Sequence, residues 1–307
     1  MDLDGRREST NVEDRRGMSG GAKAGLGGGI MGIIIALIAM FMGGGGLDLG
    51  SILGQMGNMG GIEMQQGTDN NGEPVEFSAE EQELASFSKK ILGGTEDIWS
   101  QIFEQQGLGE YRDPKMVLYS GMTSTACGQG QAAMGPFYCS GDQSLYLDLS
   151  FFMSMKQQLG ADGDFSYAYV IAHEVGHHVE YLTGVLQQIH SKMARYGQGS
   201  AQANKESVRI ELLADYLAGC WAHYDNQQFG SVQDGDLEEA IDCAQKIGDD
   251  YLQKKAQGYA MPESFTHGTS QQRMRWFKAG YQTGDVKKGI NAAMQLDYSQ
   301  LCLSVKG

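Results

Sequence analysis

The chain has 307 residues, which is enough for one large domain with an appendage or for two modest domains. Its formal net charge of -15 argues against a nucleic-acid-binding protein, because an acidic surface is repelled by the phosphate backbone. Glycine is concentrated in a few segments, and these clusters suggest where folded parts begin and end.

The first 47 residues differ in composition from the rest of the chain. Residues 1–23 carry charged and polar side chains with few apolar ones, so we expect a disordered segment. Residues 24–47 hold no charge and have an apolar centre, and about 20 residues suffice to cross a bilayer as a helix. We expect a transmembrane anchor there, with a cleaved signal peptide as the alternative. Because basic residues precede this span, the N-terminus should be cytoplasmic and the rest of the chain outside.

Residues 48–77 are rich in Gly, Met, Gln and Asn without a sustained period, which is typical of a flexible linker. Folded structure should begin at Ser78, because Ser78 and Glu81 have the spacing of a capping box. We therefore place one domain over residues 78–307. Its first part should form two helices, 78–92 and 95–106, each ended by glycine.

Four of the five cysteines form two plausible pairs. Cys127 and Cys139 bracket a Gly-rich loop, and Cys220 and Cys243 lie in two predicted helices joined by a polar turn. If these helices form an antiparallel hairpin, the second pair lies face to face. We expect both disulfides, with Cys302 left over, as in an oxidising compartment. Buried free thiols are the alternative.

The motif His173-Glu174-Val175-Gly176-His177 lies in a helix predicted over residues 167–182. Residues four apart share a helix face, so both imidazoles can hold one metal ion. Glu174 falls beside the pair, where it can take a proton from a water activated by the metal. This is the zincin arrangement. A surface helix with titratable residues is the alternative.

Residues 144–151 alternate between apolar and polar side chains, which predicts a strand shortly before the metal helix. In zincin folds this strand usually lies at the edge of the sheet above the cleft, where a peptide can pair with it. Residues 146–151 are therefore the candidate substrate-lining strand, and an interior strand is the alternative.

A catalytic zinc site needs a third protein ligand and an open position. A helix predicted over residues 201–224 carries Glu211 and Asp215 four apart, among apolar neighbours that would make unpartnered carboxylates unfavourable. Glu211 can complete the coordination, and Asp215 can accept the ring N–H of a metal-bound histidine. This pair resembles the gluzincin branch of the metallopeptidases. Other candidates for the third ligand are Glu206, His223 and His267.

His267 precedes a predicted helix that contains Arg273. A similar spacing of His and Arg occurs in membrane gluzincins, where the pair is thought to steady the substrate oxyanion. His267 is the first candidate for this role and Arg273 the second. The alternative for residues 266–270 is the N-cap region of the next helix.

Further segments complete a family pattern: residues 6–16, 136–139, 146–148 and 265–268, together with the motifs above. They resemble the bacterial putative neutral zinc metallopeptidase family over nearly the whole chain. The resemblance implies a membrane-anchored peptidase that depends on Zn²⁺, acts on peptides or proteins, and has a gluzincin-like fold.

We therefore expect an α+β, mainly helical, zincin-like domain with a small antiparallel sheet, preceded by a single transmembrane helix. It should sit outside the cytoplasm at the bacterial inner membrane and hydrolyse peptide bonds. His173, His177 and Glu211 should bind Zn²⁺, and Glu174 should act as the general base. Two alternatives stay open: a non-catalytic envelope protein with a structural zinc, and a hydrolase of cell-wall amides.

Overall fold

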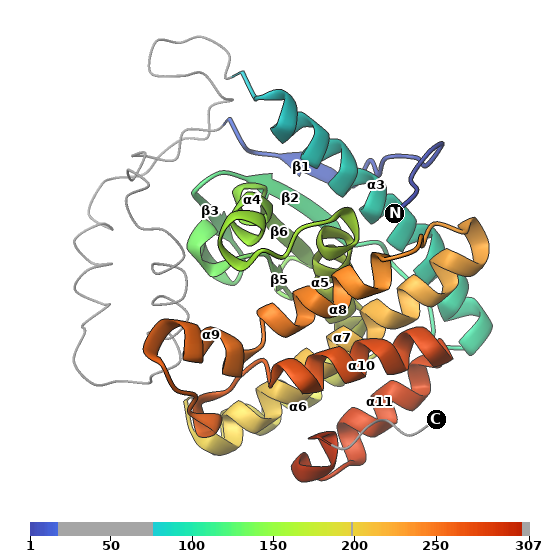
Figure 1. Ribbon diagram of the computed structural model, residues 1–307. Helices are drawn as coiled ribbons and strands as arrows, with labels where there is room; N and C mark the ends of the chain where they lie inside the picture. Colours follow the sequence, from blue (N-terminus) through green and yellow to red (C-terminus); the bar gives the residue numbers. More distant parts are fainter. Residues whose placement is uncertain (18–75, 198, 303–307) are drawn as a thin grey trace.

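The computed structural model describes residues 1–17, 76–197 and 199–302, and it sets a small mixed sheet against a larger helical body (Figure 1). The sheet has four strands in the order β1-β2-β6-β5. Their bounds are Val12–Asp14 (β1), Lys115–Tyr119 (β2), Phe137–Cys139 (β5) and Ser144–Asp148 (β6). A separate hairpin is formed by β3 (Met122–Thr125) and β4 (Gly128–Gln131).

The expected antiparallel sheet is wrong for most of the main sheet. β1, β2 and β6 run parallel to one another, and only β5 runs antiparallel to β6. Residues 120–143 separate β2 from β6, so the chain has room for the crossover that a parallel pair requires.

β6 is an interior strand, which corrects the expected position of the substrate-lining edge. It lies between β2 and β5, and all five of its residues are buried. The residues that follow it form α4 (Ser150–Ser154) rather than more strand. The edge strand beside the helical body is therefore β5.

The helices account for most of the described residues. Their bounds are α3 (Ala79–Gln106), α5 (Asp164–Leu182), α6 (Val185–Tyr196), α7 (Ala201–Phe229), α8 (Asp236–Lys246), α9 (Asp249–Gln257), α10 (Ser270–Thr283) and α11 (Val286–Gln295). Shorter turns are the π-helix η2 (Met155–Leu159) and the 3₁₀ turns η1 (Ala132–Met134), η3 (Pro262–Ser264) and η4 (Tyr298–Cys302). α7 runs through the core and packs on α5, α6, α10 and α11.

α3 begins at the predicted capping box of Ser78 and Glu81, which is confirmed. It is one helix, however, where two were expected. Gly93 lies inside it and is buried, and a Cβ there would come within 2.9 Å of the Arg7 carbonyl oxygen. The glycine therefore allows the N-terminal segment to cross α3 closely, rather than ending the helix.

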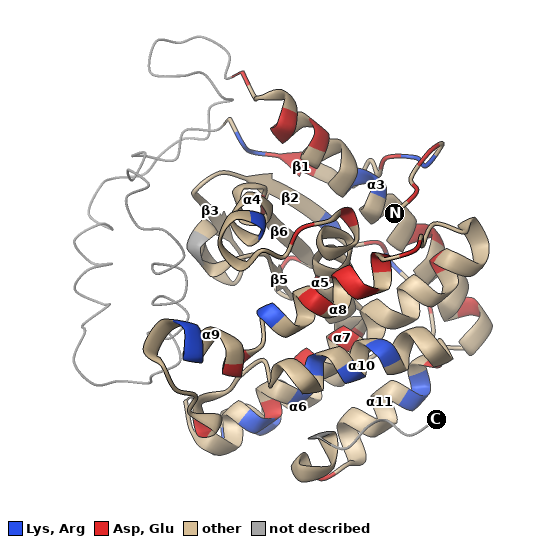
Figure 2. Ribbon diagram, viewed as in Figure 1, with Lys and Arg blue, Asp and Glu red and all other residues tan. Residues whose placement is uncertain are grey.

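Residues 1–17 pack on the domain, so the expected disorder is wrong for them. The Arg7 guanidinium lies 2.8 Å from the Glu96 carboxylate, which also accepts hydrogen bonds from Ser9 and Asn11. Arg6 pairs with Asp225 of α7 at 2.7 Å. Figure 2 shows acidic positions along α3 and α8, and these carboxylates supply partners for a basic segment. These ion pairs attach the N-terminal segment to α3 and α7.

The expectation of a transmembrane helix in front of the domain also needs correction. Within residues 1–17, 76–197 and 199–302, no helix is long and apolar enough to cross a membrane. The predicted span, residues 24–47, lies outside the described residues. Val12 pairs with Met116 in one sheet, so these two residues lie on the same side of any membrane.

One of the two expected disulfides is present. Cys127 and Cys139 are bonded and tie the β3–β4 hairpin to the end of β5, with their Cα atoms 5.8 Å apart. Cys220 and Cys243 are free and buried, so the second disulfide is wrong. The reason is that α8 packs mainly on α5 and α10 instead of folding back along α7.

Candidate metal centre

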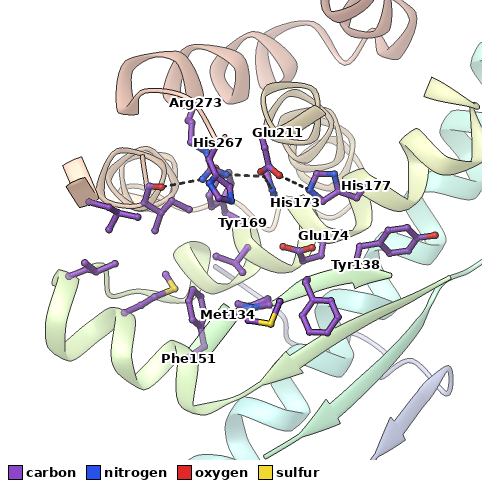
Figure 3. A pocket seen from close by; sticks show the side chains of 18 of the residues that line it. Met134, Tyr138, Phe151, Tyr169, His173, Glu174, His177, Glu211, His267 and Arg273 are labelled. Carbon is purple, nitrogen blue, oxygen red and sulfur yellow. Dashed lines mark hydrogen bonds and ion pairs between the residues drawn. The ribbon is translucent and has the colours of Figure 1, made fainter. Parts of the chain in front are cut away.

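Two histidines of α5 and one glutamate of α7 converge on a common point. One ligand atom each from His173, His177 and Glu211 lies within 4.8 Å of the others. The carboxylate oxygens of Glu211 are 3.2 Å from Nε2 of His173 and 3.7 Å from Nε2 of His177 (Figure 3). Two imidazoles and a carboxylate form a donor set of catalytic zinc sites, so these residues fit that ion.

Gly176 explains how the two helices come close enough. A Cβ at this position would lie 2.9 Å from the carbonyl oxygen of Ala214 and 3.1 Å from its Cα. α5 and α7 are therefore in near backbone contact there, which a larger residue would prevent. Glu211 lies one turn before Ala214 on α7, and the close crossing brings it to the histidines.

Asp215 holds the ring of His173 from behind. Its Oδ1 lies 2.8 Å from Nδ1 of His173 and accepts a hydrogen bond from the Tyr169 hydroxyl at 2.5 Å. Asp215 is fully buried, and Arg273 donates to both of its oxygens at 2.9 Å. Arg273 lines the same cavity, but its guanidinium supports Asp215, which differs from the substrate contact expected of it.

Charge partners also determine the protonation of the metal-free site. Burial lowers the pKa of His173, but Asp215 and Glu211 outweigh this and raise it to about 10. Burial alone would raise the pKa of Glu211, yet His267, His173 and His177 together hold it well below its ordinary value. The site without metal therefore pairs a protonated imidazole with a carboxylate.

Glu180 contacts Nδ1 of His177, as Asp215 contacts Nδ1 of His173. The sequence reasoning missed Glu180. Its Oε2 lies 2.9 Å from Nδ1 of His177, and the side chain is fully buried. The spacing of three residues on one helix face was the available signal. Burial raises the pKa of Glu180 well above its ordinary value, whereas burial of Asp215 is outweighed by the charges of Arg273 and His173, which lower its pKa. Both Nδ1 atoms nevertheless face acidic side chains, so both Nε2 atoms are directed at the metal position.

Glu174 lies on α5 between the two histidines, and its carboxylate faces the cavity (Figure 3). It is 8% exposed, and burial raises its pKa above the ordinary value. A carboxylate with a raised pKa is a stronger base than a solvated one, which suits proton transfer near neutral pH.

His267 lines the same cavity and is held by Asp249, a second residue that the sequence reasoning missed. Asp249 Oδ2 accepts hydrogen bonds from the backbone N–H groups of Thr266, His267 and Gly268, at 2.7 to 2.9 Å. Its Oδ1 lies 3.2 Å from Nδ1 of His267. Burial lowers the pKa of His267, but Glu211 and Asp249 raise it overall. The other candidates for the third ligand have different partners: Glu206 pairs with Arg209, and His223 bonds the Tyr281 carbonyl.

His178 points away from the ligands, as its place on the helix predicts. Its Nδ1 accepts a hydrogen bond from the Tyr138 hydroxyl at 2.9 Å, and its Nε2 donates to the Arg112 carbonyl at 2.6 Å. Burial lowers the pKa of His178 to about 4. A neutral imidazole thus connects edge strand β5 to the metal helix.

The chain is similar to one family model and to bacterial proteins. A family model described as "Putative neutral zinc metallopeptidase" matches residues 1–290. The uncharacterized protein YpfJ of Escherichia coli is 49% identical over 291 residues, which cover 93% of this chain and 96% of that protein. An uncharacterized protein of Mycobacterium tuberculosis is 42% identical over 185 residues, covering 57% of this chain and 61% of that protein. No solved structure gives a significant match.

Proposed function

Because the chain belongs to the putative neutral zinc metallopeptidase family, we propose that it hydrolyses peptide bonds with Zn²⁺ held by His173, His177 and Glu211. The observation that carries this proposal is the convergence of three ligand atoms within 4.8 Å of one another. Glu174 lines the same cavity, and a purely structural zinc site has no need of such a carboxylate.

When bound, Zn²⁺ supplies Lewis-acid chemistry, which acidifies water and polarises a carbonyl group. Glu174 then accepts the proton of the attacking water and later donates it to the leaving amine. Burial raises the pKa of Glu174, so the proton is accepted more readily than by a solvated carboxylate. Asp215 and Glu180 fix the orientation of the two histidine rings throughout.

His267 is assigned to the oxyanion of the tetrahedral intermediate. It lines the cavity that holds the proposed metal ligands, and its Nδ1 is oriented by the Asp249 carboxylate at 3.2 Å. A donor fixed in this way needs little reorganisation when negative charge develops on the substrate oxygen. Arg273 takes no direct part, since its guanidinium binds Asp215.

The peptide main chain is assigned to edge strand β5. This strand ends the sheet, packs on α5, and contributes Phe137 and Tyr138 to the cavity wall. A peptide that pairs with this edge is bound through main-chain hydrogen bonds, which do not depend on its side chains.

The domain is assigned to a compartment outside the bacterial cytoplasm. The disulfide between Cys127 and Cys139 supports this, because disulfides persist mainly in oxidising environments. Substrates would then be peptides or proteins of the cell envelope.

The decisive test is Glu174→Gln in the full chain. We expect this variant to bind one Zn²⁺, as measured by metal analysis, and to lose hydrolysis of a peptide mixture. Glu238→Gln is the matched control, because it makes the same change at an exposed position of α8. Full activity in Glu174→Gln would exclude the general base. Cleavage of cell-wall fragments in place of peptides would identify an amidase instead.

A further inference from the structure

The cavity beside the metal position has a second part whose wall is mainly apolar. Its total volume is about 330 Å³, and only part of its wall carries charge. The apolar part of the wall, which we call the apolar compartment, consists of Met134, Phe151, Met155, Leu159, Val170 and Leu252. Figure 3 shows Met134 and Phe151 on the side of the cavity away from His177.

We propose that the apolar compartment binds one bulky apolar side chain of the substrate, next to the bond that is cleaved. This inference rests on the proposed peptidase function and adds the class of substrate. A compartment of this kind selects peptides with residues such as Phe, Leu or Met at one position.

The distance along α5 supports a position adjacent to the cleaved bond. Val170 lies three residues before His173, so the compartment begins about one helical turn, about 5 Å, from the metal ligands. A residue neighbouring the scissile carbonyl would place its side chain at a comparable distance. Side chains of an extended peptide on β5 alternate between two faces, so one of the residues flanking the bond points toward α5.

The floor of the compartment is built by a local departure from α-helical geometry. Residues Met155–Leu159 form a π-helical turn directly after α4, and it ends at Gly160 with φ of 63°. Met155 and Leu159 are the buried residues of this turn, and both line the cavity. Single π-helical turns occur frequently at functional sites.

Charge is confined to the metal end of the cavity. The charged groups of the wall are Glu174, Glu211 and Arg273, besides the histidines, and Arg273 is already bound to Asp215. Lys156 is a neighbour of Met155 on the π-turn, but its side chain is exposed and pairs with Asp162 at 3.2 Å. Ser154 adds one hydroxyl to the wall, but a charged substrate side chain would lose its hydration in the compartment without gaining a charged partner.

The first test uses the full chain with bound Zn²⁺ and a mixture of random-sequence peptides, with cleaved bonds identified by mass spectrometry. We expect one position flanking the cleaved bonds to be enriched in Phe, Leu and Met over Asp, Glu and Lys by about 10-fold or more. Cleavage without such enrichment would overturn the apolar compartment and leave the peptidase function intact.

A binding measurement separates the two proposals if no peptide is cleaved. The full-chain Glu174→Gln variant is titrated with fluorescent peptides that differ only in one residue, Phe or Asp. Weaker binding of the Asp peptide by about 10-fold or more supports the compartment even where peptidase activity fails. Equal binding of both peptides overturns it.

Leu252→Arg tests the compartment from the side of the protein. Leu252 belongs to α9 and is only partly buried, so a cation can be introduced there with limited disturbance of the core. We expect the preference to shift by about 10-fold or more toward Asp and Glu at the same position. Tyr259→Arg adds the same charge at a residue that is 57% exposed and outside the cavity wall, and should leave the preference unchanged. An identical profile for Leu252→Arg and the control would contradict the assignment.

Discussion

The hydroxyl of Tyr138 donates a hydrogen bond to Nδ1 of His178 across 2.9 Å, so the edge strand and the metal helix are directly bonded. His178 is fully buried and its other nitrogen donates to the Arg112 carbonyl. Besides its pairing with β6 and the disulfide at its end, β5 is therefore bonded to the metal helix through one neutral imidazole.

Tyr138→Phe should weaken the binding of peptide while leaving zinc binding intact. The change removes the donor and leaves the buried Nδ1 of His178 unpartnered, which costs about 1–3 kcal/mol. We expect lower stability in urea, a raised KM, and unchanged zinc content. Tyr196→Phe is the control, since Tyr196 is 52% exposed on α6. Equal stability of both variants would mean that the bond to His178 contributes nothing.

His178 should also make the fold sensitive to acid. Burial lowers its pKa from 6.5 to about 4. Between these two pH values His178 is protonated in the unfolded chain and neutral in the folded chain. Its contribution is fully present above pH 6.5 and is lost as the pH falls toward 4, with a maximum of about 3 kcal/mol. Urea unfolding between pH 7 and pH 4 should show a smaller loss for His178→Gln than for the native protein. Parallel curves would contradict this source of acid sensitivity.

Gly176→Ala should separate the ligands. An added Cβ would come within 2.9 Å of the Ala214 carbonyl oxygen, so α5 and α7 must move apart. We expect the zinc dissociation constant to rise by about 10-fold or more, measured by competition with a chelator, because Glu211 lies on the displaced helix. Ser191→Thr adds a methyl group at an exposed position of α6 and should change nothing. Native zinc affinity in Gly176→Ala would show that the close crossing of α5 and α7 does not determine the positions of the ligands.

Zinc binding should release a proton at neutral pH. In the metal-free site the pKa of His173 is raised to about 10, whereas metal coordination requires the neutral ring. Affinity should therefore increase as the pH rises toward 10, and calorimetry in buffers of different ionisation enthalpy should detect the released proton. Asp215→Asn should reduce this release, because Asp215 is the main group that raises the pKa. Binding heats that are equal in all buffers would contradict the protonated ring.

Local periodicity explains what the sequence could predict of the site. His173 and His177 share a helix face by spacing alone, and Glu211 and Asp215 do so on a second helix. The structure brings all four together. Glu180 follows the same rule, but nothing in its spacing distinguishes it from a surface carboxylate.

The contacts that were missed depend on tertiary structure. Asp249 binds backbone N–H groups of residues 266–268, and no side-chain pattern records such a contact. Alternation over residues 144–151 indicated a strand but not its neighbours. The edge position was expected from the usual zincin fold, and the alternative, an interior strand, is the one observed. The many charged residues in 1–17 suggested disorder. Their partner Glu96 lies far away in the sequence, so this contact could not be predicted from local composition.

The parallel pairing of Val12–Asp14 with residues 116–118 also limits the possible membrane topology, because the paired residues must lie on the same side of any membrane. Compartment-sensitive enzymes such as alkaline phosphatase, fused in turn to either end of the chain, should give the same signal, because both ends of the sheet-forming chain share one aqueous phase. For the same reason, a truncated protein that starts at Ser78 should be less soluble than the whole, since it exposes the unpaired edge of β2.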